Sequence, residues 1–269
     1  MYKLDYHLHT DYSLDCYEPM VNIIKGAIAH GLDEIVITDH VDFTREMQPV
    51  RGSIDYDKYI TQLFDFKNIY SNKIKIKFGI ELGAEPLEHK KINEFLKKYK
   101  YDFIIMSSHT TAGYDLWAGE LFIGRSKKES YSMYFEEILQ NIKLVEKFCV
   151  YGHLDFIPRY WRTGDNSLVY EDYKDIIDSI LKALIEKGKG VEVNTSGIRY
   201  GLNTVHPQLS ILKRYKELGG EILTLGSDAH KQKDVASDFD KGYEIIKAAG
   251  FKYLTRFDNL EPEFFEIKF

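Results

Sequence analysis

The sequence has few cysteines, no long apolar run and no basic tract, and each shortage excludes a class of protein. Its two cysteines, Cys16 and Cys149, lie far apart and form no CxxC motif, so we expect reduced thiols and no disulfide framework. No apolar run approaches the roughly 20 residues that span a bilayer. Residues 1–5 lead straight into a strand pattern, so no signal peptide is expected. The sequence therefore predicts a cytoplasmic protein without a membrane partner.

The charge balance argues against a nucleic-acid partner. The 269 residues include 42 Asp and Glu against 36 Lys and Arg, which gives a formal net charge of -6. Binding to nucleic acid without sequence preference depends on Lys and Arg that meet phosphates. A small anionic substrate is still compatible with this chain, because a few local cations suffice. The oligomeric state does not follow from the sequence.

Short apolar runs alternate with helical patterns along the chain, which predicts a parallel α/β architecture. Apolar residues recur at helical spacing in three long segments, and glycines stand where helices should stop. The length fits one large domain over residues 1–269. The predicted strands are 3–9, 34–38, 74–81, 103–107, 150–153, 190–194 and 221–225, and the clearest helices are 20–30, 127–148 and 170–187.

Polar residues follow nearly every predicted strand, and this favours a closed or distorted (β/α) barrel over an open doubly wound sheet. Barrel sites are built from many strand ends, whereas open sheets place their site at one switch point. The longest irregular stretches are 41–56 and 110–126. Loops of that length in a compact domain usually cover the site or contact substrate.

Six of the nine histidines lie at predicted strand ends. Side chains at i and i+2 of a strand point the same way, so His7 and His9 can reach one ion. The same holds for Asp228 and His230 if the strand persists that far. Imidazole and carboxylate suit Zn²⁺, Mn²⁺ or Fe²⁺. The donors exceed what one ion needs, so we expect two or three ions, with Glu81 as the bridging carboxylate.

The remaining histidines have simpler interpretations. His30 ends a helix, where a cation favours the helix dipole, and His89 lies in a polar segment. His206 precedes a proline at a helix start and is a weaker candidate for a substrate contact. If the six histidines at strand ends were purely structural, the same pattern would have to arise independently at five strand ends. Metal binding is therefore the favoured interpretation of these six histidines.

The motifs HxH, TDH, a mid-chain Glu, SSH, GHLD and SDAH occur in this order and together resemble the polymerase and histidinol phosphatase (PHP) family over essentially the whole chain. The resemblance implies a distorted (β/α)₇ barrel with a trinuclear metal centre at the C-terminal ends of the strands. Some members have His where this chain has Asp15. The implied ligands are His7, His9, Glu81 and Asp228 for the first ion, Glu81, His109 and His153 for the second, and Asp15, His40 and His230 for the third.

Segments 152–159 and 192–199 are most similar to the histidinol-phosphatases of that family. Each places an arginine past a strand end, where a guanidinium can bind two phosphate oxygens. The resemblance implies hydrolysis of L-histidinol phosphate to L-histidinol and phosphate. The implied catalytic residues are Glu81, Asp228, Arg159 and Arg199, with Arg125 and Arg162 as weaker phosphate contacts. Glu192 or Asp42 could pair with the substrate ammonium group, and Asp228 or a metal-bound water could protonate the leaving group.

Three alternatives stay open at this point. The substrate could be another phosphate ester, such as a nucleotide or a phosphotyrosyl protein. An amidohydrolase-type barrel also uses HxH after its first strand, but would normally show a metal-binding lysine and a different histidine spacing. A barrel that binds metal without catalysis is disfavoured, because inactive homologues tend to lose ligands and this set is complete.

Overall fold

A computed structural model describes residues 2–43 and 55–268. Its main sheet is parallel, in the order β1-β2-β4-β5-β8-β9-β10, with β3 beside β4. Ile37 of β2 pairs with Phe78 and His40 of β3 pairs with Glu81, so β3 continues β2 after a short break. The strands are β1 (Leu4–Asp5), β2 (Glu34–Ile37), β3 (His40–Asp42), β4 (Lys75–Gly83), β5 (Phe103–Ser107), β8 (Val150–Tyr151), β9 (Gly190–Asn194) and β10 (Leu223–Gly226).

The sheet closes on itself between its first and last strands. The Tyr6 N–H donates to the Leu225 carbonyl across 3.0 Å, and Leu8 forms a parallel bridge with Ala229. This closure confirms the predicted distorted barrel and excludes the open sheet. It also brings the two ends of the chain's barrel segment side by side.

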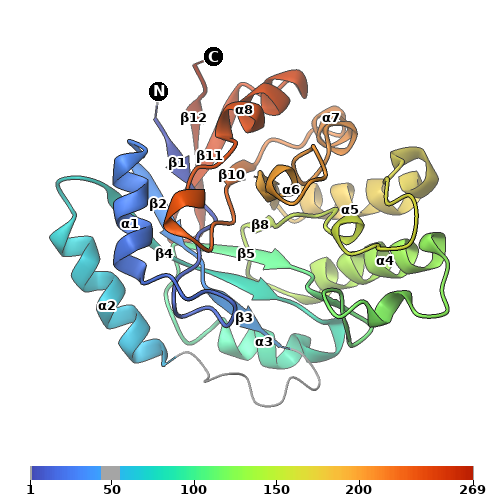
Figure 1. Cartoon of the computed structure of the whole chain (residues 1–269), viewed down its shortest axis with the longest axis horizontal. Helices are drawn as coiled ribbons and strands as arrows, with labels where there is room; N and C mark the ends of the chain where they lie inside the picture. The colour runs from blue at the N-terminus through green and yellow to red at the C-terminus, as the bar shows by residue number, and fades with distance from the viewer. Residues whose placement is uncertain (1, 44–54, 269) are drawn as a thin grey trace.

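The helices lie around the outside of the strands (Figure 1). α5 shows why they pack there: Ile177, Ile180 and Leu184 are buried on one face at helical spacing. α4 begins at a capping box in which Ser126 and Glu129 satisfy each other's backbone N–H groups. The helices are α1 (Met20–Ala29), α2 (Tyr56–Ile69), α3 (His89–Phe95), α4 (Lys127–Leu144), α5 (Lys174–Glu186), α6 (Ser196–Arg199), α7 (Leu209–Glu217) and α8 (Phe239–Ala248).

A C-terminal hairpin, β11 (Tyr253–Asp258) with β12 (Glu261–Glu266), covers the N-terminal ends of the barrel strands. The Thr255 hydroxyl accepts the N–H of Leu223, and the Phe257 ring lies 5.1 Å from that of Phe103. This leaves the opposite end, where the strands finish, open for a site. A second hairpin, β6 (Thr110–Thr111) with β7 (Tyr114–Asp115), rises at that open end.

Several predicted bounds differ from the structure. The first predicted strand, 3–9, is regular only over Leu4–Asp5. The predicted strand 150–153 ends at Tyr151, and it cannot extend to His153 because that residue has a left-handed φ of 23°. The stretch 110–126 holds a hairpin and a short 3-10 helix. Of the predicted loop 41–56, β3 takes the start, and residues 44–54 lie outside the described residues.

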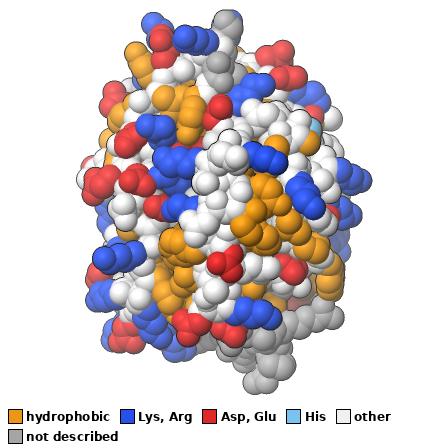
Figure 2. Space-filling view, turned by 90° about the vertical axis from the view of Figure 1, so that its left-hand side faces the viewer, with side chains coloured by type: hydrophobic (Ala, Val, Ile, Leu, Met, Phe, Trp, Pro, Cys, Tyr) orange, Lys and Arg blue, Asp and Glu red, His pale blue; other side chains and the backbone are white. Residues whose placement is uncertain are grey.

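The face that carries α1 and α2 mixes charges of both signs (Figure 2). Such interspersed charge is typical of a solvated surface. In the described part of the chain, every helix is too short or too polar to cross a bilayer.

Candidate metal centre

The first two histidines of the motif meet at one carboxylate oxygen. Nε2 of His7 lies 3.0 Å from Oε2 of Glu81, and Nε2 of His9 lies 3.4 Å from it. Leu8 between them is fully buried in the core. The alternation expected of an extended segment therefore holds, although the regular strand ends at Asp5.

Glu81 lies at the centre of the cluster and is fully buried. Its Oε2 also faces Nδ1 of His40 at 3.0 Å, because β3 sets His40 directly beside it. Its Oε1 lies 3.2 Å from Nε2 of His109 and 2.7 Å from Nε2 of His153. The two oxygens of one carboxylate thus face two separate sets of imidazoles, which is the arrangement a bridging ligand requires.

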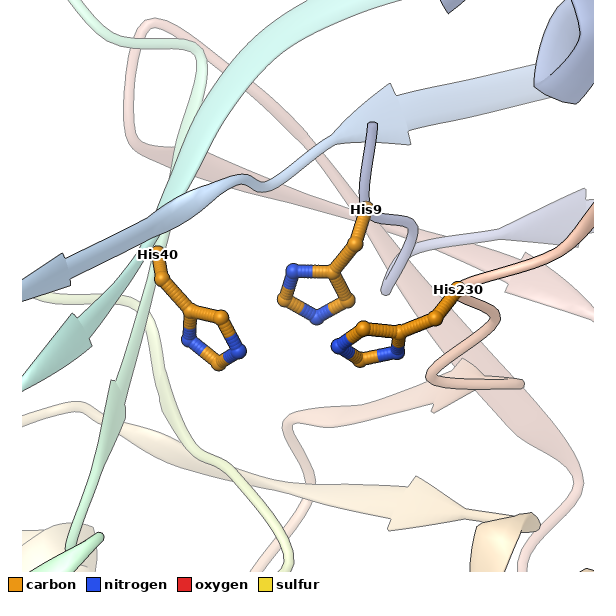
Figure 3. Close-up of side chains that lie close together, drawn as sticks. All are labelled: His9, His40 and His230. Carbon is orange, nitrogen blue, oxygen red and sulfur yellow. The ribbon is translucent and has the colours of Figure 1, made fainter. Parts of the chain in front are cut away.

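A third group of imidazoles comprises His9, His40 and His230, of which His9 and His40 also face Oε2 of Glu81. Figure 3 shows these three rings turned toward one another. The His9 ring lies 4.3 Å from that of His40 and 4.1 Å from that of His230. Asp15 joins this group from its open side: its carboxylate oxygens lie 3.5 Å from Nε2 of His40 and 3.2 Å from Nε2 of His230. Its side chain is 60% exposed, so it is the least enclosed member of the predicted set.

Asp228 reaches the centre by a route that differs from the prediction. β10 ends at Gly226, and Asp228 has a left-handed φ of 54°, so the strand does not persist to His230. The turn nevertheless places Oδ1 of Asp228 3.3 Å from Nε2 of His9 and 3.6 Å from Nδ1 of His230. The Ser196 hydroxyl donates to its other oxygen. The strand geometry expected for Asp228 and His230 was therefore wrong, but both side chains belong to the cluster.

The donor set suits divalent ions. Six buried atoms of the cluster have no hydrogen-bond partner among the described residues. One is His153 Nδ1, and the five that face other members of the cluster are His7 Nε2, His9 Nε2, His40 Nδ1, Glu81 Oε2 and His230 Nε2. Several sets of three donors lie within 4.8 Å of one another, among them His7-His9-Glu81, Glu81-His109-His153 and His9-His40-His230. Imidazole nitrogens and carboxylate oxygens that converge in this way match the ligands of zinc and similar ions.

The charges inside the cluster favour ionised acids. Burial raises the pKa of Glu81, but neighbouring His7 and His109 outweigh it and lower the pKa well below its usual range. Burial likewise raises the pKa of Asp228, but His7 and His9 outweigh burial and lower this pKa well below its usual range. Burial and nearby His230 lower the pKa of His9, which favours a neutral ring. Burial lowers the pKa of His7, His40 and His109, but Glu81 and other neighbouring carboxylates outweigh it and raise the pKa of these rings above the usual range. The cluster thus pairs anionic oxygens with protons that a bound metal would displace.

A pocket opens above the cluster and includes the stretch 110–126 through Thr110, Asp115 and Trp117. Arg159 also lines it. Its guanidinium lies 3.1 Å from the centre of the Tyr200 ring, and it forms no ion pair or side-chain hydrogen bond with the described residues.

The other three candidate arginines, Arg125, Arg162 and Arg199, do not line this pocket. Arg199 donates to the backbone carbonyls of Ser227 and Asp228, at 3.1 and 2.8 Å. Arg162 donates to the backbone carbonyl of Trp117, and Arg125 donates to the backbone carbonyl of Leu121.

Several acids behind the histidines were missed or given another role in the sequence analysis. Glu192 is fully buried beside His7, which rules out the expected contact with a substrate ammonium group. His206 is also buried; its Nδ1 lies 2.6 Å from Asp155, and it does not line the pocket. Asp39 accepts hydrogen bonds from Thr10 and so fixes the turn after β1.

Comparisons with known proteins agree with this geometry. The sequence pattern of the PHP domain matches residues 5–196. A histidinol-phosphatase of Lactococcus lactis is 32% identical over 97% of this chain and 96% of its own length, and a probable histidinol-phosphatase of Clostridium acetobutylicum is 31% identical with the same coverage. The crystal structure of the Lactococcus lactis histidinol phosphate phosphatase, complexed with zinc, L-histidinol and phosphate, superposes with a TM-score of 0.87 at 31% identity, over 97% of this chain and 98% of that one.

Proposed function

This chain belongs to the PHP domain family, and on that premise we propose that it is a metal-dependent phosphomonoesterase that hydrolyses L-histidinol phosphate to L-histidinol and phosphate. The observation that carries the proposal is the convergence of imidazoles on the two oxygens of Glu81, beneath a pocket that Arg159 enters. The structure of the 31% identical relative holds zinc, L-histidinol and phosphate, which supports the same substrate here.

We assign two or three divalent ions to the cluster, with zinc, manganese or iron as candidates. Glu81 would bridge the first two ions, and Asp15 with His40 and His230 would hold the third. Ions bound here supply Lewis acidity, which lowers the pKa of water and neutralises phosphoryl oxygens. The full set of proposed ligands is His7, His9, Asp15, His40, Glu81, His109, His153, Asp228 and His230.

The chain's own cations and acids complete the site. Arg159 is held by stacking on Tyr200, so its N–H groups are free to donate to phosphate oxygens. Arg199 donates from Nη2 to the backbone carbonyls of Ser227 and Asp228, while its buried Nη1 has no hydrogen-bond partner among the described residues. We keep Arg199 as a second candidate for a phosphate contact. The low pKa of Asp228 favours a role as a ligand over one as proton donor to the leaving group.

The test is phosphate release by protein purified with its metal. We expect a kcat/KM for L-histidinol phosphate of about 10⁴ M⁻¹s⁻¹ or more, as for a dedicated enzyme. Nucleotides, sugar phosphates and a phosphotyrosyl peptide should react far more slowly. A faster reaction with one of these compounds would overturn the proposed substrate but would still support phosphoesterase activity. No turnover with zinc, manganese or iron would overturn both.

A further inference from the structure

We propose that Glu192 is a positioning residue of the metal centre: it keeps the proton of His7 on Nδ1 and holds the backbone of His153, so that Nε2 of His7 faces the ions. This inference rests on the proposed metal site and names a residue outside its ligand set. Glu192 lies on β9 and is fully buried.

Three donors surround the Glu192 carboxylate. Oε1 lies 2.5 Å from Nδ1 of His7, and Oε2 accepts the N–H of His153 at 2.9 Å. Nδ2 of Asn194 donates to Oε2 at 3.1 Å. A carboxylate only accepts hydrogen bonds, so it places the ring proton of His7 on Nδ1. The lone pair of that imidazole is then on Nε2, the atom that faces Glu81.

A glutamine cannot reproduce this arrangement. If its oxygen faced His7, its NH₂ group would point at the N–H of His153 and at the amide of Asn194, donor against donor. If its NH₂ group faced His7, Nδ1 would have to accept, and the ring proton would move to Nε2, where an ion should bind. The first orientation leaves buried donors unsatisfied, and the second places a proton on the nitrogen that should bind an ion.

The neighbouring strand ends leave room for this carboxylate. A Cβ at Gly226 would lie 2.6 Å from Oε1 of Glu192, and one at Gly152 would lie 3.3 Å from Oε2. A Cβ at Gly226 would therefore collide with the carboxylate as well as with Cβ of His7, whereas one at Gly152 would first collide with Ser107 and Ile105. Gly226 thus leaves the space that the Glu192 carboxylate needs behind the His7 imidazole.

Glu192 also connects two parts of the cluster. His7 groups with His9 and Glu81, His153 groups with His109 and Glu81, and the two histidines also group together with Asp228. Because one buried carboxylate holds a member of each group, its loss should weaken the binding of more than one ion.

The experiment compares Glu192→Gln and Glu192→Asp with the wild type and with Glu34→Gln. Glu34 is a matched control: it is also a fully buried strand carboxylate, but it accepts from the Tyr2 and Tyr6 hydroxyls at the other end of the barrel. Metal content is measured by elemental analysis after dialysis against graded chelator, and the visible absorption of the cobalt-loaded protein reports the ligand field.

We expect Glu192→Gln to need about 10- to 100-fold less chelator for metal loss, the usual effect of removing such a partner. Its cobalt spectrum should change, Glu192→Asp should recover part of the difference, and Glu34→Gln should match the wild type in both readouts. Unchanged metal retention in Glu192→Gln, or an equal loss in Glu34→Gln, would overturn the proposal. These readouts use no substrate, so they stand apart from any failure of histidinol phosphate hydrolysis.

A second measurement covers the case in which Glu192→Gln does not fold. Long-range ¹⁵N–¹H NMR of the zinc-loaded wild-type protein reads the tautomer of His7 directly. A proton on Nδ1 supports the proposal, and a proton on Nε2 overturns it.

Discussion

Oδ1 of Asp42 lies 2.8 Å from Nδ1 of His109, while Nε2 of the same ring lies 3.2 Å from Oε1 of Glu81. The imidazole thus stands between two carboxylates, one that orients it and one that shares its proposed ion. A Cβ at Gly83 would collide with the Asp42 carboxylate, so the pair depends on that glycine.

From this relationship we predict that Asp42→Asn lowers kcat/KM by roughly 10- to 100-fold and makes the second ion easier to remove. The reason is that an amide can turn its NH₂ group toward Nδ1 and favour the wrong tautomer of His109. Steady-state kinetics and metal analysis check it, with the exposed Asp165→Asn as control. If only KM rises and metal is retained, Asp42 contacts the substrate ammonium group instead.

Glu81→Gln should remove activity almost completely, by about a thousandfold or more, because members of one catalytic unit fail together. Its carboxylate takes part in two of the donor groups found among the described residues, and its two oxygens face different sets of imidazoles. Metal analysis should show loss of at least one ion per chain. A variant that kept its full metal content and more than a tenth of the wild-type kcat would contradict a bridging role.

Arg159→Ala should lower kcat/KM for L-histidinol phosphate by roughly a hundredfold, on the scale of losing one charge-stabilising donor. Arg159→Lys should recover only part of this, because an ammonium cannot bind two oxygens in a fork. Arg162→Ala is the matched control, since its guanidinium is already bound to a backbone carbonyl. Equal losses in both alanine variants would show that Arg159 has no special part in phosphate binding.

Removal of the ions should lower the melting temperature, and added zinc should restore it. Ligand that binds only the folded state stabilises it by about 4 kcal/mol at a thousand times its Kd. Thermal melts with chelator, followed by zinc titration, check this. Melting temperatures that do not respond to either would mean that no tight ion is held.

Glu137 gives a prediction for stability against pH. Burial raises its carboxyl pKa from 4.5 to about 7, although the Ala112 N–H donates to it. Because the folded pKa is the higher one, stability is lost as pH rises from about 4.5 to about 7 and is constant above that. Glu137→Gln should therefore be the more stable protein at pH 8, by up to about 3 kcal/mol, with little difference at pH 4.5. Denaturant unfolding at both pH values measures it, and a variant less stable at pH 8 would contradict it.

The sequence was informative where chemistry repeats at a fixed spacing. His7 and His9 alternate along an extended segment, and Glu81 ends a long apolar strand, so their common direction followed from local rules. The role of Glu192 did not follow, because its partner His7 is far away in sequence and meets it only when the barrel closes. The backbone conformation of Asp228 did not follow either, since a left-handed residue inside a motif that looks extended leaves no signal in residue type.

The seam between β1 and β10 has a consequence for how the protein is made. His7 and His9 leave the ribosome more than 200 residues before Asp228 and His230. Domains form from the N-terminus onward during synthesis, yet the Leu8–Ala229 bridge cannot exist until that late segment is free. The nascent chain thus carries its early histidines without their partners until that segment has been made, and the proposed set of ligands is complete only from that point.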